Sequence, residues 1–285
     1  MTQIDASRLD HYRDALLYEI AFRGRKADVS YFVEIANRAR EQGVLDGPII
    51  EWGAGTGRVS FALARAGHNV LAIDASKNML HRLQEKKRRY PRKVGKRVQP
   101  LFGDMRSTKI DFRSGLILGT FNVVAHLAAY QDAIAFFRNS KDHLTEGGLF
   151  AFDVPLPLAD EVHCEPGMVH HAPKFKHPQT KEWIRHQEIF HYDAFHQVLA
   201  VKNIYTSSEG DELTVPLNLR QWFPRELEAA LNYAGFSHVQ TTADYTDLPG
   251  QLCRDSLVYH CHNDHPQPAH SKSASRTSSE RKNLP

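Results

Sequence analysis

The segment from Ile49 to Arg58, with the sequence IIEWGAGTGR, restricts the fold of this chain more than any other stretch. Its two isoleucines favour a buried strand, and the run VSFALARA at 59–66 has the pattern of a helix. Glycines at alternate positions between them allow a tight turn and let a ligand approach the main chain. The first N–H groups of the helix have no intrahelical partner. We therefore predict a strand, a turn and a helix, and a turn that can bind a ligand.

A second apolar run, NVLAI at 69–73, ends in Asp74. A glycine-rich turn alone is often only structural, but a carboxylate at this distance can accept hydrogen bonds from both hydroxyls of a ribose. The spacing E-x-G-x-G-x-G is not that of the dinucleotide fingerprint. The pair of runs therefore predicts a site for an adenosine-containing ligand.

Four segments in order resemble the motifs of the class I S-adenosylmethionine-dependent methyltransferases, in particular those that act on small molecules. The first two are the glycine turn and Asp74, which resembles the acid at the end of the family's second strand. The third is VQPLFGDMR at 98–106, and the fourth is LTEGGLFAFDV at 144–154. Together they cover roughly residues 45 to 155, with ordinary connection lengths between them.

The resemblance implies S-adenosyl-L-methionine as the cofactor and assigns it a set of contacts. Asp74 would bind the ribose, and Asp104 the adenine amino group. Tyr18-Glu19 followed by Asp28 resembles the segment that covers the cofactor in this family, although Tyr18 can equally be a core residue of an amphipathic helix. The predicted cofactor-binding residues are Tyr18, Glu51, Gly53, Gly55, Gly57, Asp74, Ala75, Met79, Gly103, Asp104 and Met105.

The segment 120–127, TFNVVAHL, would pass the methyl group of the donor in this family. Methyl transfer is an in-line displacement, so the protein mainly positions the donor and the acceptor, and a base is needed only for a protonated acceptor. His126 is the first candidate base because imidazole titrates near neutral pH, and Asn122 is a second polar group in reach. Asp153 is a further candidate. The structural alternatives are a histidine satisfied within a helix turn and an aspartate that acts as a cap.

Strands and helices alternate along the chain, which predicts an α/β fold with a doubly wound, mostly parallel seven-stranded sheet of the Rossmann-like methyltransferase type. A departure from the family pattern lies at 112–114, where the usual acid before strand four is missing. The strands are expected near 47–51, 69–74, 98–102, 116–122, 148–154, 238–245 and 255–261, and the helices near 57–66, 76–89, 130–143 and 224–235.

The chain divides into four parts by pattern. Residues 1–44 form an N-terminal helical cap, with helices over 5–22 and 27–43, and the methyltransferase core comprises 45–159 and 223–262. Three β-like runs, 182–192, 196–207 and 212–222, predict an antiparallel lid inserted at 160–222, which carries the acceptor region and can serve a homodimer. Residues 263–285 are polar and serine-rich, which predicts a disordered tail.

The charge and the cysteine pattern limit the other classes of protein. A net charge of +3 over 285 residues is too small to imply nucleic-acid binding, although the basic run 86–97 is either a solvated helix end or an RNA-docking patch. The three cysteines form no C-x-x-C pair, and the N-terminal sequence resembles no signal peptide, so we expect a cytoplasmic protein without a membrane segment. The histidines of 160–222 lack metal-ligand spacing, and we predict no metal site.

These observations predict a methyltransferase that transfers a methyl group to a nitrogen or oxygen of a small-molecule acceptor. Two alternatives stay open. One is an RNA or ribosome methyltransferase that docks through 86–97, and the other is a non-catalytic, cofactor-binding interaction protein on the same fold.

Overall fold

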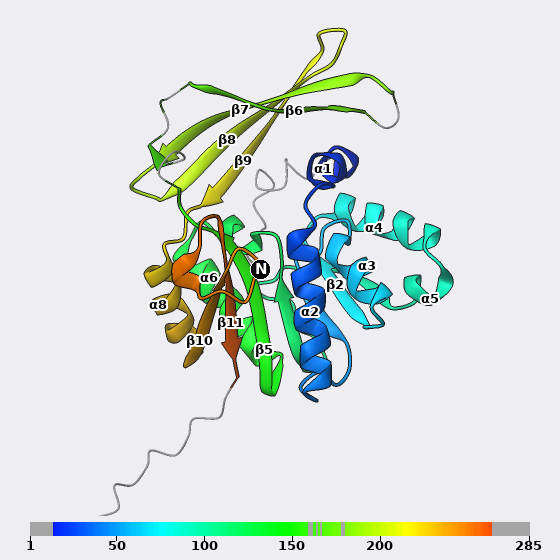
Figure 1. The fold of residues 1–285 in the computed structure, drawn as a ribbon, viewed down its shortest axis with the longest axis vertical. Helices are drawn as coiled ribbons and strands as arrows, with labels where there is room; N and C mark the ends of the chain where they lie inside the picture. The colour runs from blue at the N-terminus through cyan, green and yellow to red at the C-terminus, as the bar shows by residue number, and fades with distance from the viewer. Residues whose placement is uncertain (1–13, 159–161, 164, 166, 178–179, 264–285) are drawn as a thin grey trace, which may run out of the picture.

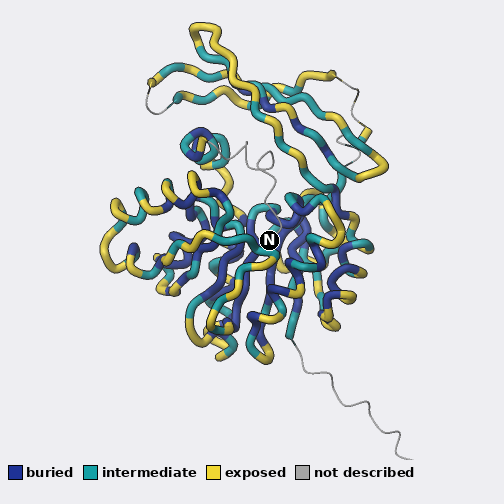
Figure 2. Tube along the Cα trace, turned by 180° about the vertical axis from the view of Figure 1, so that it is seen from behind, coloured by how far each residue is buried: buried dark blue, intermediate teal, exposed yellow. Residues whose placement is uncertain are grey.

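The computed structural model describes residues 14–158, 162–163, 165, 167–177 and 180–263. It contains a large central sheet covered by helices and a second, four-stranded sheet at one end of it (Figure 1). Figure 2 shows that the buried residues gather around the central sheet, while the second sheet is mostly half-buried or exposed. The core of the described chain therefore lies in the first of these two parts.

The central sheet has seven strands in the order β10-β11-β5-β4-β1-β2-β3. Strands β1 to β5 pair in parallel, and β11 is antiparallel to β5 and to β10. The predicted fold class is thereby confirmed. The bounds are Ile49–Trp52 for β1, Val70–Asp74 for β2, Val98–Phe102 for β3, Ser114–Gly119 for β4, Leu144–Pro155 for β5, His238–Ala243 for β10 and Ser256–His262 for β11.

Helices cover both faces of this sheet because both faces are apolar. One core cluster contains Trp52, Phe136 and Phe150 and packs under α6 and α8, and the other contains Phe32 and Phe61 and packs under α2 and α3. Full burial of one such side chain contributes roughly 1.5–3 kcal/mol. The helices are α2 (Ala27–Glu41), α3 (Arg58–Arg65), α4 (Lys77–Arg89), α5 (Arg92–Gly95), α6 (Tyr130–Asp142), α8 (Pro224–Ala234) and the 3-10 helices η2 (Val123–His126) and η3 (Gly250–Leu252).

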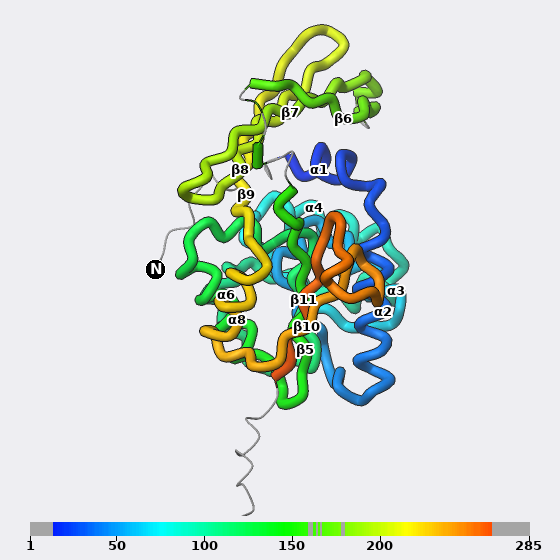
Figure 3. The backbone as a smooth tube through the Cα atoms, turned by 60° about the vertical axis from the view of Figure 1, so that its left-hand side comes forward, coloured from blue at the N-terminus to red at the C-terminus, as the bar shows by residue number. Residues whose placement is uncertain are grey.

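The second sheet is an antiparallel meander in the order β6-β7-β8-β9. The strands are Val169–Lys176, Trp183–Asp193, Val198–Thr206 and Glu212–Arg220. The sequence predicted only three of them. Strand β6 was missed because Pro173 and a register shift between Ala172 and Phe175 interrupt its alternation. Figures 1 and 3 both show helix α1 (Ala15–Phe22) between this sheet and the rest of the molecule.

Several elements differ from the prediction, and two predicted segments lie partly outside the described residues. Strand four ends at Gly119 instead of residue 122, because Phe121 and Asn122 adopt left-handed backbone conformations with φ of 62° and 60°. A short helix, α5, forms inside the basic run. The predicted helix over 5–22 is described only from residue 14, where the Asp14 side chain caps α1, and the predicted tail lies outside the described residues except for Asn263.

No helix in the described ranges is long and apolar enough to cross a membrane.

Candidate cofactor-binding site and its surroundings

The carboxyl ends of β1, β2, β3 and β4 meet around one cavity, at the point where the strand order reverses. It encloses about 130 Å³. The lining residues are Tyr18, Gly53, Gly55, Ile73, Asp74, Ala75, Met79, Gly103, Asp104, Met105, Arg106, Thr120, Phe121, Val123, His126 and Leu127.

The three glycines of the turn have positive φ angles, but they serve different purposes. A Cβ on Gly53 would lie 2.4 Å from Val123 Cγ2, and one on Gly57 would lie 2.9 Å from Phe61 Cε2. Gly55, with φ of 54°, has nothing within 4 Å of its Cβ position. Gly53 and Gly57 therefore permit close packing, whereas Gly55 leaves open space on the cavity side for a ligand. Gly57 does not line this cavity.

Asp74 closes β2 with both carboxylate oxygens held by the main chain. The N–H of Gly55 donates to Oδ2 at 2.7 Å, and the N–H of Ser76 donates to Oδ1 at 2.7 Å. Burial raises the pKa of this carboxyl to about 6. Each oxygen keeps a second acceptor site, so the oriented carboxylate can accept hydrogen bonds from a pair of hydroxyls in the cavity.

The third motif carries a residue that the sequence reasoning missed. Arg106 donates to both oxygens of Asp104, from Nε at 3.0 Å and from NH2 at 2.6 Å, and it donates to Asp132 at 2.8 Å. Burial alone would raise the pKa of Asp104, but these hydrogen bonds hold it below its ordinary value. The sequence signal for this pairing is the basic residue that directly follows Gly-Asp-Met, two positions after the aspartate. The guanidinium fixes the carboxylate on the cavity wall.

Tyr18 reaches the cavity from α1. Its ring lies 4.9 Å from that of Phe22 and 6.2 Å from that of Phe121, measured between ring centroids. Burial raises the pKa of the Tyr18 hydroxyl. An aromatic wall therefore connects the N-terminal helix to the loop after β4.

Asp153 anchors that loop from below and does not line the cavity. It is fully buried and accepts hydrogen bonds from the N–H groups of Phe121 (2.7 Å) and Asn122 (3.2 Å) and from the Tyr245 hydroxyl (2.8 Å). Burial raises the pKa of this carboxyl to about 6. Since left-handed backbone is unfavourable for residues other than glycine, these bonds hold Phe121 and Asn122 in place.

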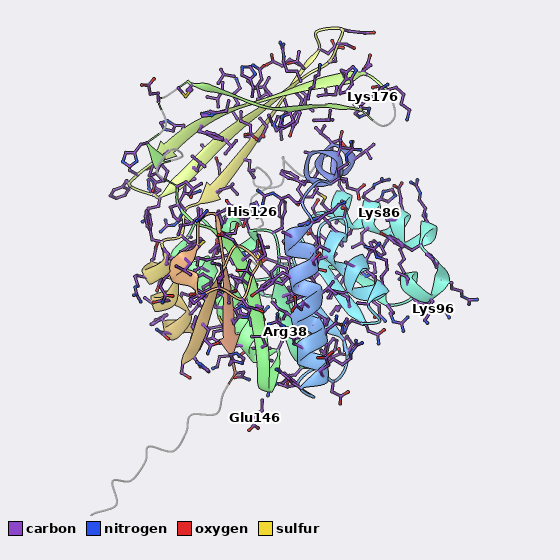
Figure 4. All side chains as sticks on the ribbon, viewed as in Figure 1. Arg38, Lys86, Lys96, His126, Glu146 and Lys176 are labelled. Atoms are coloured by element: carbon purple, nitrogen blue, oxygen red, sulfur yellow. The ribbon has the colours of Figure 1, made fainter. Side chains whose placement is uncertain are left out.

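The other two candidate catalytic residues take different positions. His126 ends η2 and lines the cavity, and Figure 4 shows it at the end of the core that faces the second sheet. Asn122 does not line the cavity, and its Oδ1 is buried without a hydrogen-bond partner among the described residues. The segment after β9 contacts this loop, because Nε1 of Trp222, the second residue after that strand, donates to the carbonyl of Val124 at 3.2 Å.

Glu51, a predicted cofactor contact, is placed beneath the glycine turn and away from the cavity lining. Its side chain is 1% exposed and accepts hydrogen bonds from Ser60 Oγ and, at 3.2 Å, from Thr120 Oγ1. Burial raises the pKa of Glu51 to about 7. The carboxyl group thereby joins β1, the helix after it and the end of β4.

The side chains of the basic run differ in their exposure and contacts. Arg88 and Arg89 are exposed, whereas Lys86 contacts Glu19 at 2.5 Å and Thr56 Oγ1 at 3.4 Å. Within the parts of the chain that the structure describes, no three histidine, cysteine, aspartate or glutamate side chains converge as metal ligands.

The chain is similar to known methyltransferases. A family model described as a methyltransferase domain matches residues 50–150. The cypemycin N-terminal methyltransferase of a Streptomyces species is 32% identical over 114 residues, which is 40% of this chain and 44% of that protein. The chain thus matches less than half the length of this curated relative.

Two solved structures show the same fold over most of both chains. The CcbJ methyltransferase of Streptomyces caelestis has a TM-score of 0.72 and 24% identity, and the alignment covers 84% of this chain and 96% of that one. CalS10, an amino pentose methyltransferase of Micromonospora echinaspora solved with S-adenosylmethionine bound, has a TM-score of 0.62 and 18% identity, with coverage of 86% and 96%. The chain therefore has the fold of these methyltransferases, and residues 50–150 match the methyltransferase-domain family model, in the region where the motifs lie.

Proposed function

We propose that this protein transfers a methyl group from S-adenosyl-L-methionine to an amine nitrogen of a small molecule. The observation that carries the proposal is the Asp74 carboxylate, held by the N–H groups of Gly55 and Ser76 beside the open space at Gly55. This arrangement suits the ribose of the donor. Asp104, fixed by Arg106, faces the same cavity and suits the adenine amino group.

The nitrogen acceptor is supported by the names of the relatives. One methylates a peptide N-terminus, and another is an amino pentose methyltransferase. A protonated amine must lose its proton before it attacks the sulfonium methyl group, so a nitrogen acceptor requires a base. His126 is the candidate for this role because it lines the cavity, whereas Asp153 is engaged with the loop behind it.

The donor site is tested by calorimetric titration of the protein with S-adenosylhomocysteine. We expect micromolar binding that Asp74→Asn weakens at least tenfold, because the amide presents one acceptor oxygen where the carboxylate presents two. Affinity should also fall below about pH 6, where the raised pKa of Asp74 leaves the carboxyl protonated. Asp46→Asn, at an exposed position, serves as the control. Equal binding by the Asp74 and Asp46 variants would contradict the assignment.

Acceptors are then screened by methyl transfer to amino sugars and to peptides with free N-termini. Binding of the donor analogue without turnover of any amine would favour the interaction-protein alternative. The RNA alternative stays a prediction, since the exposed arginines of α4 are compatible with docking and nothing in the cavity favours a nucleic-acid acceptor.

A further inference from the structure

A second cavity of about 600 Å³ lies beside the first, between α1, α2, α3 and α4. Tyr18 lines both cavities and so separates them. Seven basic residues and one acid contribute to its walls. The basic residues are Arg23, Arg25, Lys26, Arg58, Arg65, Arg82 and Lys86, and the acid is Glu19.

Three of these cations are neutralised by carboxylates. Arg58 pairs with the buried Asp28, donating from NH1 to Oδ1 at 2.8 Å. Glu19 is shared between Arg82, at 2.8 Å, and Lys86, at 2.5 Å. Arg82 also contacts Glu85, outside the cavity lining. The carboxylates near the cavity are therefore already paired with these three cations.

The other four basic side chains of the cavity lack such a partner in the described part of the chain. Within the described ranges, Arg23, Arg25, Lys26 and Arg65 have no carboxylate within 4.0 Å. Arg25 lies over the ring of Phe121 at 5.3 Å, which holds its guanidinium at the boundary with the first cavity. Like charges gathered around one cavity repel one another, and a bound anion relieves that repulsion.

We propose that this basic cavity binds a ligand bearing a phosphate or diphosphate group, distinct from the methyl donor. Arginine is the residue best suited to this chemistry, because its planar fork of donors matches phosphate oxygens in pairs. The phosphate belongs either to the methyl acceptor, which then extends past Tyr18, or to a separate small molecule. Figure 4 shows Lys86, which lines the cavity, beside α1, and Lys96 well away from it at the far end of α5.

The first test is calorimetric titration of the full chain with inorganic pyrophosphate at low salt. We expect saturable binding of one pyrophosphate per chain, with a Kd that rises at least tenfold in the double variant Arg23→Gln/Arg65→Gln. Neither residue contacts the wall of the first cavity. The matched control, Lys93→Gln/Lys96→Gln, removes two exposed cations outside the cavity and should bind as the unmodified protein does.

Three results would overturn the proposal. They are the absence of saturable binding, equal affinity in the two double variants, and displacement of pyrophosphate by S-adenosylhomocysteine. The last would mean that the cavity holds the carboxylate of the donor. Retained S-adenosylhomocysteine affinity in Arg23→Gln/Arg65→Gln shows that the variant is folded.

The source of the phosphate is then resolved by methyl transfer, a step that rests on the proposed function. Glucosamine and glucosamine 6-phosphate are compared as acceptors. A fall in kcat/KM for the phosphorylated acceptor alone in Arg23→Gln/Arg65→Gln assigns the phosphate to the acceptor. A change in the rate with glucosamine when pyrophosphate is added assigns it to a separate ligand. The binding experiment needs no acceptor, so failure of methyl transfer leaves its result intact.

Discussion

Replacement of Glu51 by glutamine should stabilise the protein at neutral and alkaline pH. Glu51 is buried beneath the glycine turn, and burial raises its pKa from the ordinary value of 4.5 to about 7. The folded state therefore binds a proton more tightly than the unfolded state does. At about 1.36 kcal/mol per pKa unit, this difference between the pKa values of Glu51 in the folded and unfolded states corresponds to roughly 3 kcal/mol of unfolding free energy.

The sign of the pH dependence follows from the raised pKa. The contribution of Glu51 is fully present below about pH 4.5 and is lost as the pH rises to about 7, because the buried carboxyl must then ionise. Glu51→Gln has no proton to lose and can still exchange hydrogen bonds with Ser60 and Thr120. The difference in unfolding free energy between the variant and the unmodified protein should therefore shift in favour of the variant by about 3 kcal/mol between pH 4.5 and pH 8.

The assay is urea unfolding followed by tryptophan fluorescence at several pH values, with the two proteins compared at each pH. Taking the difference removes the titration of all other groups. Glu41→Gln, at the exposed last residue of α2, is the control for replacing a carboxyl group by an amide, whereas Glu146, at the far end of the core in Figure 4, keeps its carboxyl in both proteins. A difference for Glu51→Gln that changes by less than about 1 kcal/mol across this range would refute the reasoning.

Two further predictions concern the loop after β4. His126→Asn should lower kcat for an amine acceptor at pH 7 by about 10²-fold, which is the lower end of general-base effects. The affinity for S-adenosylhomocysteine should stay unchanged. Recovery of the rate as the pH rises would show that a base has been lost, whereas an unchanged pH–rate profile would exclude His126 as the base. Asp153→Ala should cost about 3–5 kcal/mol of unfolding free energy, because it leaves buried N–H groups unpaired, and Tyr245→Phe about 1 kcal/mol. The double variant should show a coupling above about 0.5 kcal/mol, whereas strict additivity would mean that the two side chains do not interact.

The parts of the fold that were predictable from the sequence depend on local chemistry. The glycine turn and Asp74 follow from residues within about two dozen positions, and the structure brings them together through the hydrogen bond from the Gly55 N–H to Asp74 and the parallel pairing of β1 with β2. Helices α2, α3, α4, α6 and α8 were predictable for the same reason, because their apolar spacing is a local pattern, whereas the short α5, η2 and η3 were not. Local patterns were enough to place the cavity at the correct edge of the sheet.

The parts that were not predictable depend on contacts between distant residues. The left-handed turn at Phe121 and Asn122 requires a carboxylate from the next strand and a hydroxyl from Tyr245, 92 residues beyond Asp153. Nothing near Asn122 indicates this turn, so strand four was extended through it. Similarly, the position of Glu51 in the motif suggests a ligand contact. In the structure its carboxyl group is buried and accepts hydrogen bonds from Ser60 and Thr120, which come from other parts of the chain.

The hydrogen bond from Trp222 to the carbonyl of Val124 joins the end of the second sheet to the segment that carries His126. Trp222 is buried, so its side chain belongs to the core and not to the second sheet. If the second sheet is exchanged for that of a relative, the graft should end before Trp222, so that the recipient keeps its own tryptophan. Such a graft replaces only the strands of the second sheet, whereas one that includes Trp222 also changes the contact that holds the segment with His126.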